Sequence, residues 1–410
     1  SNKENMDFGF GLKELIAGPV DMQDTRIGGR VTNSKMYIDF LSMHDKEKLV
    51  HVLYKIALEE DNIKIQIDPD DFILNKKPWE INPNNSVTLT KTNTIFEDFE
   101  MSYNNQRITA GNNLQGISKE HLGINFENFK LANIMSLLNP DAALARGKLS
   151  GQFAVEDPYT SPGMVLDLNI RDFEVLETNM GVLTAQGNSI SNSGYDFQMA
   201  IKEGVADLDL KGNYTANETA AQIDLNLDLN RFDVAALEKL SFGELSNADG
   251  TISGAMKLAG TTAEPKYEGA FQFDNAKFEV TKLNASFLLK NENLNLNNEG
   301  VTFNNFRVED ENANPIVVNG SIGTESFVNP TFDLDLKATN FKAINSTKDD
   351  FDLVYGTAVF DADAQITGDL NLPKVTLDLT VNSDTDVTYV LPPSEVQIES
   401  KEGVVLFVNK

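Results

Sequence analysis

The chain of 410 residues carries 62 acidic and 34 basic side chains, which gives a formal net charge of −28. This charge repels the phosphates of nucleic acids and of anionic lipids, so it argues against nucleic-acid partners and against electrostatic binding to a membrane surface. The sequence has no cysteine, which excludes disulfides, thiolate nucleophiles and cysteine-ligated metals. Because single hydrophobic cores rarely exceed about 250–300 residues, the length predicts several domains or one repetitive structure.

The two ends of the sequence predict a segment of a longer protein. Ser1 and Asn2 resemble the remnant of a removed tag, and the chain closes on an apolar run at 404–408 that has the length of a strand. No apolar run in the sequence approaches the ~20 residues that span a bilayer. We therefore expect a membrane anchor or signal peptide, if there is one, to lie outside this segment.

Early in the chain, residues 48–58 fit both a helical face and strict alternation of apolar and polar side chains. The acidic residues 59–61 would oppose the dipole of a helix that ended there, whereas with Asn62 they make a good turn into the alternating run at 63–67. We predict two strands joined by a hairpin.

Farther along, four segments alternate strictly, so that each has one apolar and one polar face. Fully buried parallel strands would instead show continuous aliphatic runs, so we expect sheets with one solvated face. Shorter copies occur at 122–126, 195–199 and 294–296. The apolar residues of the four segments are Met164, Leu166, Leu168 and Ile170; Ile223, Leu225, Leu227 and Leu229; Phe332, Leu334 and Leu336; and Val375, Leu377, Leu379 and Val381.

Helical patterns are short and few. Residues 131–138 form one candidate helix, and residues 234–240 form another, with Leu237 and Leu240 three apart. Asp233 precedes the second helix and is the predicted N-cap. The sequence therefore predicts an all-β fold with minor short helices.

Three landmarks recur in the same order about every 105 residues. An alternating strand ends in Asn and Phe and leads into a short helical stretch, then a glycine opens the next strand, and a proline follows downstream. A second repeated pattern relates residues 95–99 to residues 302–306. The landmarks are Asn128-Phe129, Asn230-Arg231-Phe232 and Asn340-Phe341; Gly147, Gly250 and Gly356; and Pro158, Pro265 and Pro373.

The repeat divides the chain into an N-terminal β region at 1–75 and units at 76–180, 181–285 and 286–410. One interpretation is a continuous sheet that repeats without breaks, as in solenoids. The alternative is a row of tandem β-sandwich domains. We favour the continuous sheet because no linker rich in Pro or Ser separates the units.

In this order the landmarks resemble the AsmA-like proteins, and more narrowly the TamB family in its Bacteroidetes-type form. The resemblance also rests on residues 77–81, on 105–108 and on the closing segments 389–393 and 402–407, and it covers most of residues 68–410. It implies an elongated periplasmic β structure curled into a trough with an apolar interior. Proteins of this family are tethered to the inner membrane and work with an outer-membrane barrel-assembly protein in lipid transport and outer-membrane protein assembly.

Physical reasoning leads to the same shape. A long sheet with one apolar face can bury that face by curling on itself, and the resulting groove would solvate the acyl chains of phospholipids. At roughly 12–16 residues per strand and turn, a chain of this length forms about 25–34 strands. The apolar residues of the four alternating segments are the predicted lining.

Catalytic and cofactor motifs are lacking in the sequence. His44, His51 and His121 have no metal-binding spacing, and no nucleotide-binding or nucleophile-elbow motif occurs. The acidic stretch at 310–314 has proline where a calcium loop requires glycine. We therefore expect neither cofactor nor metal and no enzymatic activity. An extracellular adhesin or glycan-binding module is the main alternative, and a polysaccharide-active enzyme is the third.

Overall fold

The computed structural model describes residues 6–17, 19–32, 34–59, 61–326 and 328–390. Strands make up 70% of the structure and helices 4%, which confirms the predicted all-β class. The strands are numbered β1 to β28 and form two antiparallel sheets. This number lies within the predicted range.

The strands of the N-terminal sheet are ordered as in the chain, beginning with β1 at one edge. Outside this order, β6 pairs with β4 and with β7. Its strands are β1 (Met6–Ala17), β2 (Val20–Thr32), β3 (Lys35–His44), β4 (Glu47–Glu59), β5 (Asn62–Ile67), β6 (Ile73–Leu74), β7 (Lys77–Pro78), β9 (Ser86–Leu89) and β10 (Thr94–Glu97).

The β4–β5 hairpin confirms the strand prediction for residues 48–58, since Glu59 pairs with Asn62. Strand β10 extends the N-terminal sheet to Glu97, so the predicted boundary at residue 75 falls inside this sheet. The division of the remaining chain into three units stays a prediction.

The long sheet adds one strand after another along the chain. Its strands are β8 (Glu80–Ile81), β11 (Glu100–Tyr103), β12 (Gln106–Gly111), β13 (His121–Lys130), β14 (Ala145–Glu156), β15 (Gly163–Val175), β16 (Thr178–Ser189), β17 (Gly194–Glu203), β18 (Ala206–Thr215), β19 (Gln222–Asp233), β20 (Leu245–Thr261), β21 (Pro265–Val280), β22 (Ala285–Asn297), β23 (Gly300–Asp310), β24 (Pro315–Gly323), β25 (Thr331–Ser346), β26 (Val354–Asp369), β27 (Pro373–Val381) and β28 (Asp386–Tyr389).

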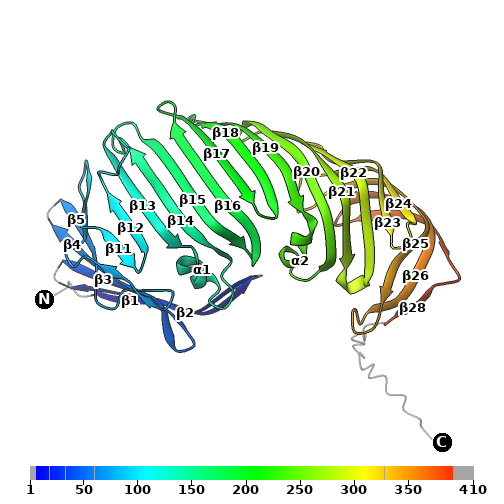
Figure 1. Cartoon of the computed structure of the whole chain (residues 1–410), viewed down its shortest axis with the longest axis horizontal. Coiled ribbons are helices and arrows are strands. Elements are labelled where there is room, and N and C mark those ends of the chain that lie inside the picture. Colours follow the sequence, from blue (N-terminus) through cyan, green and yellow to red (C-terminus); the bar gives the residue numbers. More distant parts are fainter. Residues whose placement is uncertain (1–5, 18, 33, 60, 327, 391–410) are drawn as a thin grey trace, which may run out of the picture.

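The long sheet is curled but open. Strand β8 pairs with β11 at one end, while β27 and β28 both pair with β26 at the other. No register joins β28 to β8 among the strands that the structure describes, and the sheet forms an arch with the N-terminal sheet beneath one end (Figure 1). This geometry confirms the predicted elongated, curled sheet and replaces the alternative of tandem sandwiches.

Short helices lie at the lower ends of the strands in Figure 1. Helix α1 (Ala132–Leu138) follows β13, and the 3-10 turn η1 (Val234–Ala236) with α2 (Leu237–Leu240) follows β19, close to the predicted positions. A further 3-10 turn, η2 (Thr281–Leu283), links β21 and β22.

Two details of the helix prediction are wrong. Asp233 occupies the N-cap position but makes no side-chain capping bond, because its carboxylate pairs with the guanidinium of Arg231 at 3.0 Å. After Phe341 no helix follows, since β25 continues to Ser346 and leads into a turn. The segments at 402–407 and 404–408 lie outside the described residues.

Candidate functional site: an apolar face of the long sheet

The recurring Asn-Phe landmark is a β-bulge. Asn128 and Asn340 have left-handed backbone angles, with φ of 49° and 47°, and the pairing register shifts at both positions. An extra residue in one strand bends it and re-aims the next side chain, and Asn tolerates this angle better than most residues. The following Phe129 and Phe341 are accordingly turned into the interior, where only 2% and 5% of their surface is exposed. The landmark therefore folds the sheet inward instead of ending each strand.

Glycines opposite such bulges allow two strands to approach closely. Gly250 has a φ of +92°, and a Cβ atom there would lie 2.2 Å from the carbonyl oxygen of Asn275, which itself has a left-handed φ of 48°. Only glycine fits this position without moving the neighbouring backbone. The glycine landmark of the sequence thus has a structural cause at this position.

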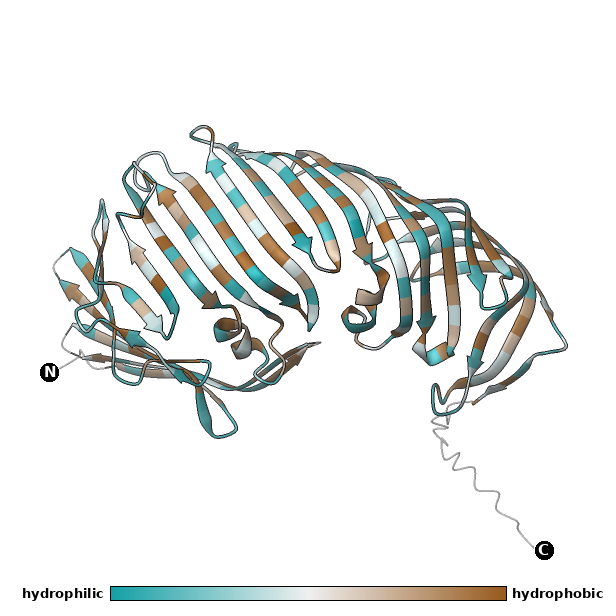
Figure 2. Ribbon diagram, viewed as in Figure 1, coloured by the Kyte–Doolittle hydropathy of each residue, from teal (hydrophilic) through white to brown (hydrophobic). Residues whose placement is uncertain are grey.

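Between the bulges, the pairing register aligns the predicted lining residues into rows that cross the strands. We call the surface that carries these rows the apolar face. Bands of hydrophobic colour cross neighbouring strands in Figure 2. Across β15 to β19 the rows are Leu166, Gly187, Phe197, Gly212 and Leu225; Leu168, Ala185, Met199, Leu210 and Leu227; and Ile170, Leu183, Ile201, Leu208 and Leu229.

The candidates of β25 and β27 are on the same face. The row of Leu227 continues through Met256, Gly269, Leu296, Val301 and Ile322 to Phe332. From β25, Leu334 and Leu336 reach Val375 and Leu377 through Ile366 and Ala364 of β26. The register thus places all four predicted segments on one surface. The remaining candidates of these segments are Met164, Ile223, Leu379 and Val381.

Burial differs along this face. Leu334 is 9% exposed, whereas the four apolar side chains of the edge strand β27, Val375, Leu377, Leu379 and Val381, are between 46% and 59% exposed. The candidates on β15 and β19 are half-buried.

Protein covers the apolar face at the β12 to β15 end. There Trp79 and Phe129, with ring centroids 5.8 Å apart, belong to a core that also includes Leu49 and Phe72 of the N-terminal region. The predicted lining residues Leu168 and Ile170 pack against this core. Since both sheets contribute to one core, their apolar faces oppose each other here.

Buried polar groups hold α1 and the N-terminal sheet in place. The Oε1 atom of Gln106 accepts hydrogen bonds from the backbone of Lys130 at 2.9 Å and from the side chain of Asn133 at 2.7 Å. Beyond the helix, the amide of Asn139 donates to the carbonyl of Pro19 at 2.8 Å, and His44 lies 3.1 Å from Asp141. These contacts tie the two sheets together and close this end of the face.

A second core covers the face from β20 to β24. It is built on Val234 of η1, Ala276, Leu289 and Phe306, with Leu237 of α2 packed against it. Helix α2 and η1 thus lie on the apolar side of the sheet.

The apolar side chains of β16 to β19 belong to neither core. Strands β16, β17 and β18 make their extensive contacts only with their neighbours in the sheet. We call the apolar side chains of β16 to β19 the uncovered span. It includes the predicted Ile223, Leu225, Leu227 and Leu229, together with Leu183, Phe197, Met199, Ile201, Leu208 and Leu210.

The apolar residues of β16 to β18 are not among the predicted lining residues, although residues 195–199 alternate in the sequence. Glycine and alanine interrupt the aliphatic pattern of β16 at Gly187 and Ala185, and charged or small residues surround that of β18. Only the register, which places Met199 and Leu210 beside Leu227, identifies them as one surface. Pairing across strands is not encoded in the periodicity of a single strand.

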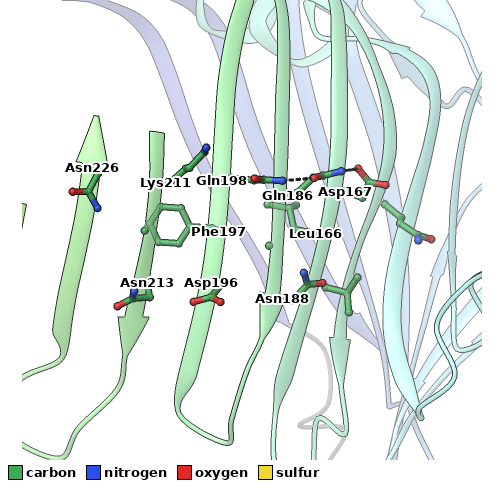
Figure 3. A pocket seen from close by; sticks show the side chains of 14 residues that line it. Leu166, Asp167, Gln186, Asn188, Asp196, Phe197, Gln198, Lys211, Asn213 and Asn226 are labelled. Carbon is green, nitrogen blue, oxygen red and sulfur yellow. Dashed lines mark hydrogen bonds between the residues drawn. The ribbon is translucent and has the colours of Figure 1, made fainter. Parts of the chain in front are cut away.

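The opposite face is polar and solvated. A shallow hollow of about 580 Å³ runs across β14 to β19 (Figure 3). Its side chains form a row in which Gln198 donates to Gln186 at 2.5 Å and Gln186 donates to Asp167 at 3.3 Å. Lys211 and Asn226 continue this row. Leu166 and Phe197 of the apolar rows also border the hollow, so polar and apolar residues line it together.

Ion pairs on the strands lower carboxylate pKa values. Hydrogen bonds from Lys202 lower the pKa values of Asp207 and Asp209 on the neighbouring strand. On β23, hydrogen bonds from Lys290 and Arg307, both at 2.8 Å, lower the pKa of Glu309. The pairs of Lys202 with Asp209 and of Lys290 with Glu309 join neighbouring strands.

The histidines and the acidic stretch at 310–314 have structural partners. His121 accepts a hydrogen bond from the backbone of Leu114 at 2.7 Å, and His51 lies 3.0 Å from Asp39. The Oδ1 atom of Asp310 accepts the backbone N–H groups of Asn312 and Asn314, both at 2.8 Å. Among the residues that the structure describes, no group of acidic and histidine side chains could hold a metal ion.

The geometry defines a class: a long, curled antiparallel sheet with one continuous apolar face, covered by protein at two places. None of its described helices is both long and apolar enough to cross a membrane. Residues 303–410 match the family model of the TamB C-terminal domain, which confirms the resemblance to the TamB type. Comparisons with curated proteins and with solved structures gave no match.

Proposed function

We propose that this chain is a periplasmic, non-enzymatic segment of a TamB-type envelope protein, and that its uncovered span binds phospholipid acyl chains. In this role it would support lipid transport between membranes and outer-membrane protein assembly. The complete protein would be tethered to the inner membrane and would work with an outer-membrane barrel-assembly protein. The match at residues 303–410 and the family resemblance support this proposal.

The uncovered span is the observation that carries the lipid proposal. Half-buried side chains such as Phe197, Met199, Leu210 and Leu227 form adjacent rows without belonging to a core. Burying apolar surface of this kind is favourable by ~0.8 kcal/mol for each methylene group that is removed from water. An acyl chain supplies many methylene groups and requires no directional contacts, so it suits a lining without hydrogen-bonding groups.

Native mass spectrometry of the chain purified from bacterial envelopes tests this proposal. We expect mass increments of phospholipids that disappear when the chain is unfolded, and the same phospholipids in an organic extract. A chain that carries no lipid and does not take up a fluorescent phospholipid would contradict the proposal. Such a result would favour the binding-module alternative.

A further inference from the structure

Two loops at the ends of β24 to β27 place aliphatic side chains in solvent. Val328 is 88% exposed, Leu370 is 56% exposed and Leu372 is 69% exposed. The loops lie side by side, because the backbone N–H of Leu370 donates to the carbonyl of Pro330 at 3.0 Å. We call Val328, Leu370 and Leu372 the apolar tip.

The backbone donors of the β26–β27 turn are satisfied within the protein. One carboxylate oxygen of Asp369 accepts the N–H groups of Asn371 at 2.9 Å and of Leu372 at 3.0 Å. The N–H of Leu370 has its partner in the neighbouring loop, and Pro373, which follows, has no N–H group. The N–H groups of this turn can therefore leave water without losing hydrogen bonds.

The apolar tip continues the apolar face. Pro373 pairs with Gly368, which pairs with Phe332, and this row leads back to the long rows of the sheet. Next to it, Val375 on the edge strand is 57% exposed. An apolar surface therefore runs from the edge strand β27 to Leu372 at the tip.

We propose that the apolar tip inserts into the surface of a lipid bilayer and places the end of the apolar face against the acyl layer. A protein partner could supply acceptors for free backbone N–H groups, whereas a bilayer interior cannot, and the backbone N–H groups of residues 370–372 need none. Because the chain carries a net charge of −28, insertion would rest on apolar contact and not on attraction to anionic headgroups. The role of this contact in lipid transport rests on the proposed function.

Flotation with phosphatidylcholine vesicles tests the apolar tip in the 410-residue chain. We expect the chain to float with the vesicles equally well at low and high salt. The double variant L370S/L372S should bind about a hundredfold more weakly, since each leucine contributes roughly a factor of ten when it leaves water. Ile190→Ser is the matched control, because Ile190 is 61% exposed after β16 and lies outside the tip, and it should float like the wild type.

Three results would overturn the inference: no flotation of the wild type, equal flotation of L370S/L372S, or an equal loss in Ile190→Ser. A dimer in sedimentation that the double variant abolishes would assign the tip to a second copy of the chain. Leu227→Asp separates the two proposals, because it should lose bound phospholipid and still float. If it keeps its phospholipid, the uncovered span is refuted while the apolar tip stands.

Discussion

Leu227→Asp places a charge in the uncovered span. Leu227 is half-buried and lies between Leu210 and Met256 in its row. Losing about half of the transfer free energy of a leucine costs about 1 kcal/mol. Leaving a carboxylate without partners among aliphatic side chains adds about 1–3 kcal/mol. We therefore expect the free energy of unfolding to fall by about 2–4 kcal/mol.

Urea unfolding measures this change, and native mass spectrometry of the same sample measures bound phospholipid, which should be lost. Asn226→Asp is the matched control, because it adds the same group one residue away on the polar face. There the new carboxylate would lie between Lys211 and Lys257 of neighbouring strands, where opposite charges stabilise pairing. The variant loses the hydrogen bond from Asn226 to Asp224 and places a carboxylate beside that of Asp224, so its stability should fall by no more than about 1 kcal/mol. Its lipid content should equal that of the wild type.

The reasoning is refuted if Leu227→Asp unfolds at the same urea concentration as the wild type and retains phospholipid. The reasoning is also refuted if Asn226→Asp loses as much stability and as much phospholipid as Leu227→Asp, because the effect would then not depend on the face of the sheet.

Three further variants test the fold. Asn305 lies in the bulge of β23, where the register with β24 shifts between Phe303 and Phe306. Asn305→Ala should lower the free energy of unfolding by about 1–2 kcal/mol in urea, because alanine is strained at the left-handed φ of 49°, while Asn305→Gly should be nearly neutral; equal losses would contradict the bulge argument. Glu309→Gln should be less stable than the wild type at neutral pH. Because the ion pairs lower the pKa of Glu309 below its ordinary value of 4.5, the ionised side chain stabilises the fold at pH values above 4.5. The difference between Glu309→Gln and the wild type should therefore vanish as the pH falls through the lowered pKa. A difference that persists in acid would refute the ion-pair account. Phe129→Ala should cost about 3–5 kcal/mol in the core between the sheets, and a loss below about 1 kcal/mol would contradict its central position.

The fold was predictable where local chemistry decides it. Alternation at 223–229 specified a strand with one apolar face, and the acidic turn before Asn62 distinguished strand from helix at 48–58. Both signals depend on side chains close together in the sequence. The even spacing of such signals was sufficient to predict a repetitive curled sheet.

Bulges and sheet pairing were not predictable in the same way. In the sequence, an Asn before a Phe suggests the end of a strand, yet at Asn128 the strand continues through a shift of register. The covering of Leu168 and Ile170 depends on Trp79 and Leu49, which lie far away in the sequence. Local patterns therefore identified the apolar face but not which part of it the protein itself covers.

Site-specific photo-crosslinking tests the central claim most directly. A benzophenone amino acid at Phe197 would lie on the apolar face of β17 and one at Gln198 on the opposite face, because successive residues of a strand point to opposite sides of the sheet. With the protein in its native envelope, we predict phospholipid adducts at position 197 and not at position 198. Adducts at neither position, or equally at both, would contradict binding of acyl chains by the uncovered span.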